Sequence, residues 1–261
     1  MNANAPISAL EDIPAVLLVG GMGTRLRPVI SSTPKPMALV GDKSFLELLI
    51  WQLRGQGIRR LVLCSGYLAD QIESKFGDGS AWGVKIQHSR EQDPLGTAGA
   101  LNLAKSYVQN AAQIMVMNGD SFLEADFSQL FRLHRERKGL ATLAVVPVQD
   151  AGRYGTVKID STRRVTGFAE KTGANAPGLI SAGVYVFERT IFDHIPEGPA
   201  SLERNVFPSV LHLGVYAFEQ CGLFIDIGTP EDYARAQTLH KQLSAVVFER
   251  QGYKPLQTGH R

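Results

Sequence analysis

The chain has 261 residues, of which 44% are hydrophobic and 20% are charged, and its 27 basic and 25 acidic residues leave a net charge of +2. This composition is ordinary for a soluble globular protein and excludes a disordered, collagen-like or fibrous chain. So slight a positive excess gives no reason to expect a nucleic-acid or membrane partner. Two cysteines, Cys64 and Cys221, are too few for a disulfide framework and favour a cytoplasmic location.

The first half of the chain alternates short apolar runs with segments of helical spacing. Runs of strand length are Ala15–Val19, Leu61–Cys64, Ile114–Met117 and Thr142–Val148. Helical spacing appears in Phe45–Leu53, Ala98–Val108 and Phe127–His134. This alternation predicts an α/β fold with a mostly parallel sheet covered on both faces, and such sheets build ligand sites at the carboxyl ends of their strands.

The pattern changes after about Pro147. We predict a β-hairpin within Arg153–Ala169, a strand at Ile180–Phe187, a short helical stretch at Leu202–Leu213, strands at Val215–Glu219 and Leu223–Ile227, and a last helix opened by Pro230. No change of composition marks a linker, so we expect one domain over residues 14–243, an N-terminal extension at 1–13 and a C-terminal tail at 244–261. No run approaches the ~20 apolar residues of a membrane helix, and the N-terminus lacks the pattern of a signal peptide.

A glycine-rich turn directly follows the first apolar run. It reads Val19-Gly20-Gly21-Met22-Gly23-Thr24-Arg25-Leu26-Arg27-Pro28. Glycines allow the backbone to approach a ligand closely, and successive N–H groups can then cradle phosphate oxygens. A tight turn that needs glycine for geometry alone is the alternative. The Walker loop and the dinucleotide fingerprint both fail to match, because no Gly-Lys-Ser/Thr follows and Leu26 stands where a third glycine is needed.

Lys35 follows this turn and stands between Pro34 and Pro36. The two prolines restrict its backbone, which is typical of a placed charge, whereas an exposed loop lysine is the alternative.

Two aspartates stand at the ends of predicted strands: Asp120 after Ile114–Met117 and Asp226 within Leu223–Ile227. Carboxylates at the mouth of a sheet suit Mg²⁺, which commonly takes one or two of them together with substrate phosphates. A helix cap or a turn is the alternative for each. The chain has no HExxH, CxxC or nucleophile-elbow motif, so zinc and serine hydrolysis have no support.

Another glycine-containing loop, Asp93–Gly99, opens an apolar helix and has Thr97 near the N-cap. Such a loop can simply cap the helix, or it can present backbone groups to a flat base.

Taken in order, these motifs resemble the sugar-1-phosphate nucleotidylyltransferases from about Pro14 to Leu243. The resemblance rests on the Gly20–Pro28 loop, Lys35 between prolines, the Pro94–Gly99 loop, Asn118-Gly119-Asp120, Glu170-Lys171 and Asp226–Pro230. It implies a Rossmann-like nucleotide-diphospho-sugar transferase fold, with a mostly parallel central sheet flanked by helices and a small β-rich sugar-binding elaboration.

Within that family, Pro34–Ala38, Phe45-Leu46-Glu47 and Pro94–Gly99 look most like the guanylyltransferases, in particular those acting on D-glycero-α-D-manno-heptose 1-phosphate. The resemblance then implies transfer of GMP from GTP to that sugar phosphate, with release of pyrophosphate, for capsule, O-antigen, lipopolysaccharide or S-layer polysaccharide. It implies Mg²⁺ as cofactor and, by analogy with relatives, a homo-oligomer that binds neither nucleic acid nor membrane.

The same resemblance implies roles for individual residues. Arg25, Lys35 and Asp120 would be catalytic, and Asp120 and Asp226 would hold the metal. The nucleotide would contact Val19, Gly20, Gly21, Gly23, Thr24, Arg25, Lys35, Glu91, Leu95, Gly96 and Thr97. The sugar phosphate would contact Asn118, Gly119, Gly155, Glu170, Lys171 and Gly183. For Gly155 and Gly183, glycine in a core strand is the alternative.

Glu91 is the candidate reader of the base. Guanine presents two donors, N1–H and an amine, and a carboxylate only accepts, whereas relatives that use thymidine place a glutamine here. A surface glutamate in the polar run Arg90–Asp93, with Leu95 and Gly96 reading the base by their backbone, is the alternative.

Other functions remain open at this point. Mannose 1-phosphate with GTP, or glucose 1-phosphate with dTTP, would use the same chemistry. A non-catalytic nucleotide-sugar sensor should lack Arg25, Lys35 or Asp120, and all three are present. A glycosyltransferase of similar fold should show Asp-x-Asp, where this chain has Asn118-Gly119-Asp120.

Overall fold

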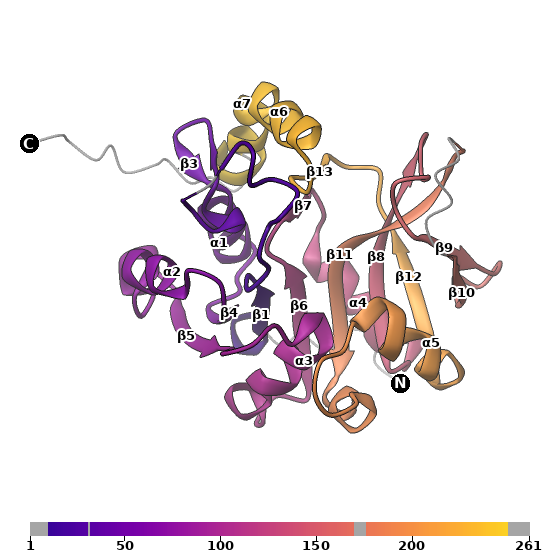
Figure 1. The fold of residues 1–261 in the computed structure, drawn as a ribbon. Helices are drawn as coiled ribbons and strands as arrows, with labels where there is room; N and C mark the ends of the chain where they lie inside the picture. The colour runs from indigo at the N-terminus through magenta and orange to yellow at the C-terminus, as the bar shows by residue number, and fades with distance from the viewer. Residues whose placement is uncertain (1–9, 31, 170–175, 250–261) are drawn as a thin grey trace, which may run out of the picture.

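A computed structural model describes residues 10–30, 32–169 and 176–249 of the chain (Figure 1). The strands are β1 (Pro14–Leu18), β2 (Leu39–Val40), β3 (Lys43–Ser44), β4 (Arg60–Ser65), β5 (Lys85–Arg90), β6 (Gln113–Asn118), β7 (Ser121–Leu123), β8 (Ala141–Val148), β9 (Thr156–Ile159), β10 (Val165–Ala169), β11 (Gly178–Glu188), β12 (Val215–Glu219) and β13 (Phe224–Asp226). The α-helices are α1 (Phe45–Gly55), α2 (Ala69–Phe76), α3 (Gly96–Leu103), α4 (Phe127–Arg137), α5 (Phe207–Val210), α6 (Pro230–Thr238) and α7 (His240–Ser244).

Short helical turns of other types join these elements. The 3₁₀ turns are Leu10–Asp12, Lys35–Met37, Ser80–Trp82, Ala104–Val108, Arg189–His194 and Leu211–Leu213, and wider π turns occur at Leu202–Val206 and Ala245–Glu249. No helix among the described residues is long and apolar enough to span a membrane.

The described strands form one large sheet and two small ribbons. Strands β5, β4, β1 and β6 run parallel in that order, and β11 then pairs antiparallel with β6. Beyond it, β11 pairs with β8, β8 pairs with β12, and the β9–β10 hairpin joins at one edge. The ribbons are β2–β3 and β7–β13. The predicted α/β class with a mostly parallel core and a β-rich addition is confirmed.

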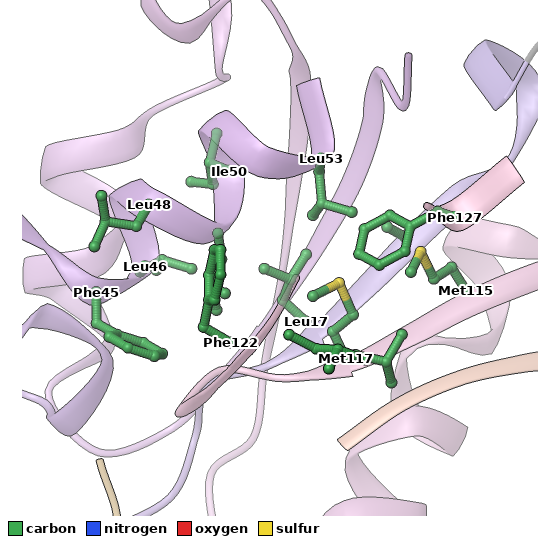
Figure 2. Packing of buried hydrophobic residues seen from close by; sticks show 14 of the residues in the cluster. Leu17, Phe45, Leu46, Leu48, Ile50, Leu53, Met115, Met117, Phe122 and Phe127 are labelled. Carbon is green, nitrogen blue, oxygen red and sulfur yellow. The ribbon is translucent and has the colours of Figure 1, made fainter. Parts of the chain in front are cut away.

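Both faces of the sheet are covered. Successive side chains of a strand point to opposite faces, so a central strand contributes residues to both core clusters. In β1, Ala15 and Leu17 belong to one core cluster and Val16 to the other. Figure 2 shows Leu17, Met115 and Met117 packed beneath α1 and beside Phe127 of α4. The opposite face is covered by α3 and by the segments around Ile191 and Phe207. This two-sided burial explains why β1, β4 and β6 read as continuous apolar runs.

Several elements differ from the sequence prediction in extent. The helix expected over Ala98–Val108 begins at Gly96 and tightens to a 3₁₀ turn after Leu103. The helical stretch at 202–213 is a succession of a π turn, the single turn of α5, which has Pro208 near its start, and a 3₁₀ turn. The last helix is divided into α6 and α7 at Leu239. Helix α2 and strand β5 were not predicted, because their apolar residues are few.

The topology places several loops at one edge of the sheet. Strands β1, β4, β5 and β6 are parallel, so their carboxyl ends meet there, and each is followed by a loop of the candidate site. The β7–β13 ribbon continues from β6, and its register pairs Ser121 with Asp226. The end of β13 and the end of β6 are therefore neighbours although more than 100 residues separate them.

Candidate functional site

Lys35 and Asp120 form the centre of the site. The Lys35 Nζ lies 2.5 Å from the Asp120 Oδ2, and the lysine side chain is 9% exposed against 33% for the aspartate. The short turn Lys35–Met37 begins after Pro34, and its residue Pro36 is buried, so the backbone of Lys35 is fixed on both sides. Lys35 is therefore a placed, nearly buried charge, as its two prolines predicted.

Asp226 lies beside this pair. The backbone N–H of Ile227 donates to the carbonyl of Asp120 at 3.0 Å, and the N–H of Gly228 donates to the Asp226 Oδ1. Burial, and next the charge of Asp120, raise the pKa of Asp226 to about 6, while Lys35 opposes that rise. An added Cβ at Gly228 would lie 2.6 Å from the Asp226 Oδ1 and 3.5 Å from the Lys35 Nζ. Gly228 thus leaves room for both charged groups.

The chemistry of these groups suits a divalent cation. Two carboxylates and one ammonium leave one negative charge uncompensated in a half-buried place. Among the described residues no group of three or more His, Cys, Asp or Glu side chains could hold a metal ion. Asp120 and Asp226 could supply two carboxylate ligands to a divalent cation whose other ligands would be water and substrate phosphates.

The glycine-rich turn wraps around Lys35. Gly23 has a φ of +56°, and an added Cβ there would lie 3.0 Å from the Lys35 Cβ. Leu26 is fully buried and anchors the turn, while Gly21, Thr24 and Arg25 are exposed. Val19 is buried where it leaves β1, and its N–H donates to the carbonyl of Cys64 at 2.9 Å. The turn therefore exposes backbone on its outer side and has the Lys35 side chain on its inner side.

Glu91, which follows β5, points back toward that turn. An added Cβ at Gly20 or at Gly66 would lie 2.7 Å from the Glu91 Oε1, so the carboxylate fits between two glycines. Its Oε2 accepts the backbone N–H of Leu95 at 3.1 Å. Burial raises the pKa of Glu91, and the Leu95 hydrogen bond partly opposes this. The polar run around Glu91 predicted a possible surface residue, whereas the side chain is half-buried at the site.

The loop before α3 is held by backbone hydrogen bonds to Ala200, which is distant in the sequence. Gly96 has a φ of +70°, and an added Cβ there would lie 2.5 Å from the carbonyl oxygen of Ala200. Ala98 donates its N–H to that oxygen at 2.9 Å, and Ala200 donates to the carbonyl of Leu95 at 2.8 Å. The Thr97 hydroxyl donates to Glu203 at 3.2 Å and makes no side-chain cap of α3. Capping is therefore not the role of Thr97.

Asn118 and Gly183 lie together on the other side of Asp120. Gly183 has a φ of +71°, and an added Cβ would lie 2.7 Å from the Asn118 Nδ2. The Asn118 Oδ1 is buried and has no hydrogen-bond partner among the described residues. Gly119 packs against the end of β1, because an added Cβ would lie 2.5 Å from a Val19 methyl carbon. Among the described residues, an added Cβ at Gly155 would meet the Ala169 oxygen at 3.4 Å.

Some predicted site residues are not brought together here. Arg25 is exposed at the outer side of the turn, and Glu170 and Lys171 lie outside the described residues. Sequence reasoning missed Gly66 and Tyr67, which follow β4 at the same edge as the other loops, and the ring of Tyr67 lies 5.1 Å from the Arg27 guanidinium. The position of Gly66 after a buried strand was a signal that could have found them. Glu203 offered no comparable signal.

Comparisons with known proteins agree on one family. The family model described as nucleotidyl transferase matches residues 14–242. The chain is 41% identical to a mannose-1-phosphate guanylyltransferase of Mycobacterium tuberculosis over 87% of its own length and 64% of that protein's length. It is 39% identical to a D-glycero-α-D-manno-heptose 1-phosphate guanylyltransferase of Aneurinibacillus thermoaerophilus over 85% of its own length and 96% of the other's.

Solved structures give the same picture. A crystal structure of HddC from Yersinia pseudotuberculosis complexed with GMP-PN matches with a TM-score of 0.78 and 34% identity, covering 87% of this chain and 98% of that one. The chain thus spans nearly the whole of HddC and of the heptose enzyme, and just under two thirds of the mannose enzyme.

Proposed function

The chain belongs to the nucleotidyl transferase family, and from this we propose that it transfers GMP from GTP to a sugar 1-phosphate and releases pyrophosphate. The sugar phosphate we propose is D-glycero-α-D-manno-heptose 1-phosphate, because the match covers 96% of the length of two heptose relatives and 64% of the length of the mannose relative. Mannose 1-phosphate is the second candidate, favoured by the 41% identity to a mannose relative. Glucose 1-phosphate with dTTP is a more distant alternative.

One observation carries the proposal. Lys35 is nearly buried between a glycine-rich turn and two strand-end carboxylates, with its Nζ 2.5 Å from Asp120. Two polyanions must approach each other in this reaction, so a site for it needs fixed positive charge and backbone donors that do not have to reorganise. The glycine-rich turn, whose glycines are at least partly exposed, and the nearly buried lysine beside it supply both.

The reaction needs no covalent intermediate with the protein. An oxygen of the sugar 1-phosphate attacks the α-phosphorus of GTP, and the bond from that phosphorus to the bridging oxygen breaks as pyrophosphate leaves. We infer that Gly20, Gly21, Gly23 and Thr24 hold the triphosphate through backbone N–H groups, with Val19 beneath them. Lys35 then neutralises charge near the transferred phosphorus, and Arg25 does so on the departing pyrophosphate.

Mg²⁺ fits the two carboxylates, and we propose that Asp120 and Asp226 hold it. When bound, the ion would supply positive charge to the phosphates and orient them. Lys35 and Gly228 support this arrangement, because the lysine balances one carboxylate and the glycine leaves space beside the other.

The choice of base is assigned to Glu91. Its carboxylate is held between Gly20 and Gly66 next to the phosphate turn, and it can accept the two donors of guanine that thymine and uracil do not offer together. Leu95, Gly96 and Thr97 would complete this nucleotide side of the site.

The sugar side is proposed to contain Asn118, Gly119, Gly155, Gly183, Glu170 and Lys171. The buried Oδ1 of Asn118, which has no hydrogen-bond partner within the described part of the chain, supports it, since a buried acceptor is costly unless a donor such as a sugar hydroxyl reaches it. Free thiols at Cys64 and Cys221 support a cytoplasmic location. A homo-oligomeric state and a role in surface polysaccharide synthesis rest on the resemblance alone.

The test is release of pyrophosphate from a panel of GTP, dTTP and UTP with heptose, mannose and glucose 1-phosphates, in the presence of Mg²⁺. We expect turnover with GTP and the heptose phosphate to exceed every other pair. In Glu91→Gln, the ratio of GTP to dTTP turnover should fall roughly tenfold or more, because a site built for two donors then faces one acceptor and one donor. Gly167→Ala, where an added Cβ would have open space, is a matched control that should keep the wild-type ratio.

Preference of the wild type for dTTP would overturn the guanylyltransferase assignment and leave the transfer chemistry standing. An unchanged ratio in Glu91→Gln would show that Glu91 does not read the base. Absence of turnover with every pair would overturn the proposed function as a whole.

A further inference from the structure

The Glu203 carboxylate accepts hydrogen bonds from three hydroxyl groups that lie in three parts of the chain. Its Oε1 accepts from the Tyr185 hydroxyl at 2.9 Å, and its Oε2 accepts from Ser201 at 2.9 Å and from Thr97 at 3.2 Å. Thr97 belongs to the nucleotide loop, defined here as Leu95–Thr97, and Tyr185 lies on β11. A carboxylate only accepts, so it can satisfy all three hydroxyls at once.

The connection continues from Tyr185 to the sugar side. The Ser181 hydroxyl donates to the Tyr185 oxygen at 3.2 Å, and the N–H of Gly183 donates to the Ser181 oxygen at 3.3 Å. Gly183 in turn lies against Asn118. Tyr185 is fully buried, and its ring centroid lies 5.3 Å from that of Phe207 and 5.9 Å from that of Phe187, so it cannot easily change its position.

On the nucleotide side, the connection depends on the direction of the hydrogen bond that the Thr97 hydroxyl donates to Glu203. Because its proton is directed to Glu203, the Thr97 oxygen can accept the N–H of Leu202 at 2.8 Å. The backbone bonds of Ala200 with Leu95 of the nucleotide loop, at 2.8 Å, and with Ala98, at 2.9 Å, lie beside this contact. Burial and the nearby Glu203 carboxylate raise the pKa of Tyr185 well above its ordinary value, so the phenol stays protonated and remains a donor.

From these contacts we propose that Glu203 is a positioning residue that fixes the nucleotide loop to the sugar-facing part of β11 at Ser181–Gly183. The inference rests on the proposed function, in which these two segments hold the two substrates. Glu203 acts through Thr97 and Tyr185, and it sets the distance at which the sugar phosphate meets the α-phosphorus. A small misplacement of two reacting groups costs orders of magnitude in rate, so this connection bears on turnover more than on the binding of either substrate.

The test compares Glu203→Ala, Glu203→Gln and a control, Glu197→Ala, which changes an exposed glutamate of the segment between β11 and β12 that takes no part in the hydrogen bonds described above. In Glu203→Ala we expect kcat to fall roughly tenfold or more, as for the loss of hydrogen bonds to a charged group, with each KM changed less than about threefold. Glu203→Gln should recover part of kcat, because its amide oxygen can still accept from Tyr185. Glu197→Ala should keep wild-type values.

Hydrogen exchange gives a readout that does not need turnover. The amides of Leu202 and Gly183 should exchange faster in Glu203→Ala than in the wild type, while those of β6 stay unchanged. Thr97→Val and Tyr185→Phe each remove one side of the connection, so the double variant should be no slower in turnover than the slower single variant.

Wild-type kcat in Glu203→Ala, additive effects of Thr97→Val and Tyr185→Phe, or unchanged exchange at Leu202 and Gly183 would each overturn the positioning role. A uniform rise of exchange across the molecule would do so too, because it would show a general loss of stability. A wild-type protein without turnover on any substrate pair would instead overturn the proposed function, and the exchange data would still show whether Glu203 fixes the loop.

Discussion

Replacing Asp120 by asparagine tests the role of its charge while leaving the fold intact. Asparagine has the same shape but cannot balance Lys35 or supply the charge that a magnesium ion needs. We expect Asp120→Asn to lower kcat by roughly two orders of magnitude, comparable to the loss of a preorganised electrostatic contact. Asp226 remains beside Lys35 and still compensates the ammonium, so the melting temperature should stay near that of the wild type.

Pyrophosphate release at saturating Mg²⁺ and thermal unfolding are the two measurements for Asp120→Asn. Asp160→Asn, in the exposed β9–β10 hairpin, is the matched control and should leave turnover unchanged. Activity near the wild-type level in Asp120→Asn would remove this residue from the metal and from the catalytic group.

Residues that act through their immediate sequence neighbours could be predicted from the sequence. Two prolines around Lys35 indicated a fixed lysine, and strand-end positions placed Asp120 and Asp226 at one edge. Glu203 could not be predicted, because its partners Thr97 and Tyr185 are 106 and 18 residues away and Glu203 itself stands in no local pattern. Its role depends on tertiary contacts alone.

The ionised Glu91 side chain should lower the free energy of unfolding at neutral pH. Its pKa is raised by burial, so ionisation is less favourable in the folded than in the unfolded protein. Below about pH 4.5 Glu91 is protonated in both the folded and the unfolded protein, and this loss of stability vanishes. The loss develops as the pH rises through the raised pKa of the folded protein and is constant above it. We therefore expect Glu91→Gln to melt at a higher temperature than the wild type at pH 7, while its discrimination for GTP falls.

Thermal unfolding of Glu91→Gln and wild type between pH 4.5 and 7 checks this sign. The difference in melting temperature should shrink as the pH is lowered. A difference that is negative, or that stays constant over this range, would contradict a desolvated carboxylate at position 91.

At the scale of elements, the start of α6 could be predicted well and its end poorly. Pro230, Glu231 and Asp232 are ordinary first-turn residues, and the helix begins at Pro230 as expected. Its division from α7 at Leu239 has no strong signal in the sequence, since neither glycine nor proline stands there. Likewise the close approach of Ala200 to α3, which explains Gly96, follows from tertiary packing.

The cap of α6 lies close to Asp226 and should affect both stability and activity. The Thr229 oxygen accepts the N–H of Asp232 at 3.2 Å, and its hydroxyl donates to the Asp232 carboxylate at 2.9 Å. Asp232 also accepts from Arg153 at 2.9 Å, which connects α6 to the segment before β9. Thr229→Ala should lower the free energy of unfolding by about 1 kcal/mol, the usual cost of an N-cap.

Urea unfolding measures that cost, and turnover at several Mg²⁺ concentrations measures its effect on the neighbouring carboxylate. We expect the Mg²⁺ requirement to rise in Thr229→Ala, because Asp226 is three residues before the cap. Thr229→Ser, which keeps the hydroxyl, should restore both properties. Failure of serine to restore them would show that the methyl group, and not the cap, is responsible.

At the scale of the whole molecule, the parallel half of the sheet could be predicted and the strand order beyond it could not. Buried runs at β1, β4 and β6 indicated parallel strands between helices, and those strands are neighbours in the sheet. The antiparallel insertion of β11 between β6 and β8 depends on long-range pairing that no local pattern encodes. Leu10, Ile13 and Val247 pack in the core, so it extends into the predicted extension and tail, whose boundaries stay predictions.

A network around the buried His134 joins α4 to three strands of the sheet. The His134 ring is fully buried; its Nδ1 lies 2.9 Å from the Thr142 hydroxyl on β8, and its Nε2 lies 3.2 Å from Glu188 on β11. Glu188 also accepts from Gln113 on β6 at 2.7 Å. Burial, more than any charge, lowers the pKa of His134, although Glu188 opposes the shift and Arg135 adds to it.

This network should make the folded protein sensitive to mild acid. The unfolded histidine takes up its proton near pH 6.5, whereas the folded one resists it, so stability is complete above that pH and is lost as the pH falls through the lowered pKa. We expect the melting temperature of the wild type to fall more between pH 8 and pH 5.5 than that of His134→Gln, which has no proton to gain. Opposing groups such as Asp226 contribute equally to both proteins and cancel in the comparison.

His212→Gln, a change at an exposed histidine, should keep the wild-type slope. Equal slopes for His134→Gln and the wild type would show that the acid sensitivity arises elsewhere, and a steeper slope in the variant would mean that Glu188 raises the pKa of His134 more than burial lowers it.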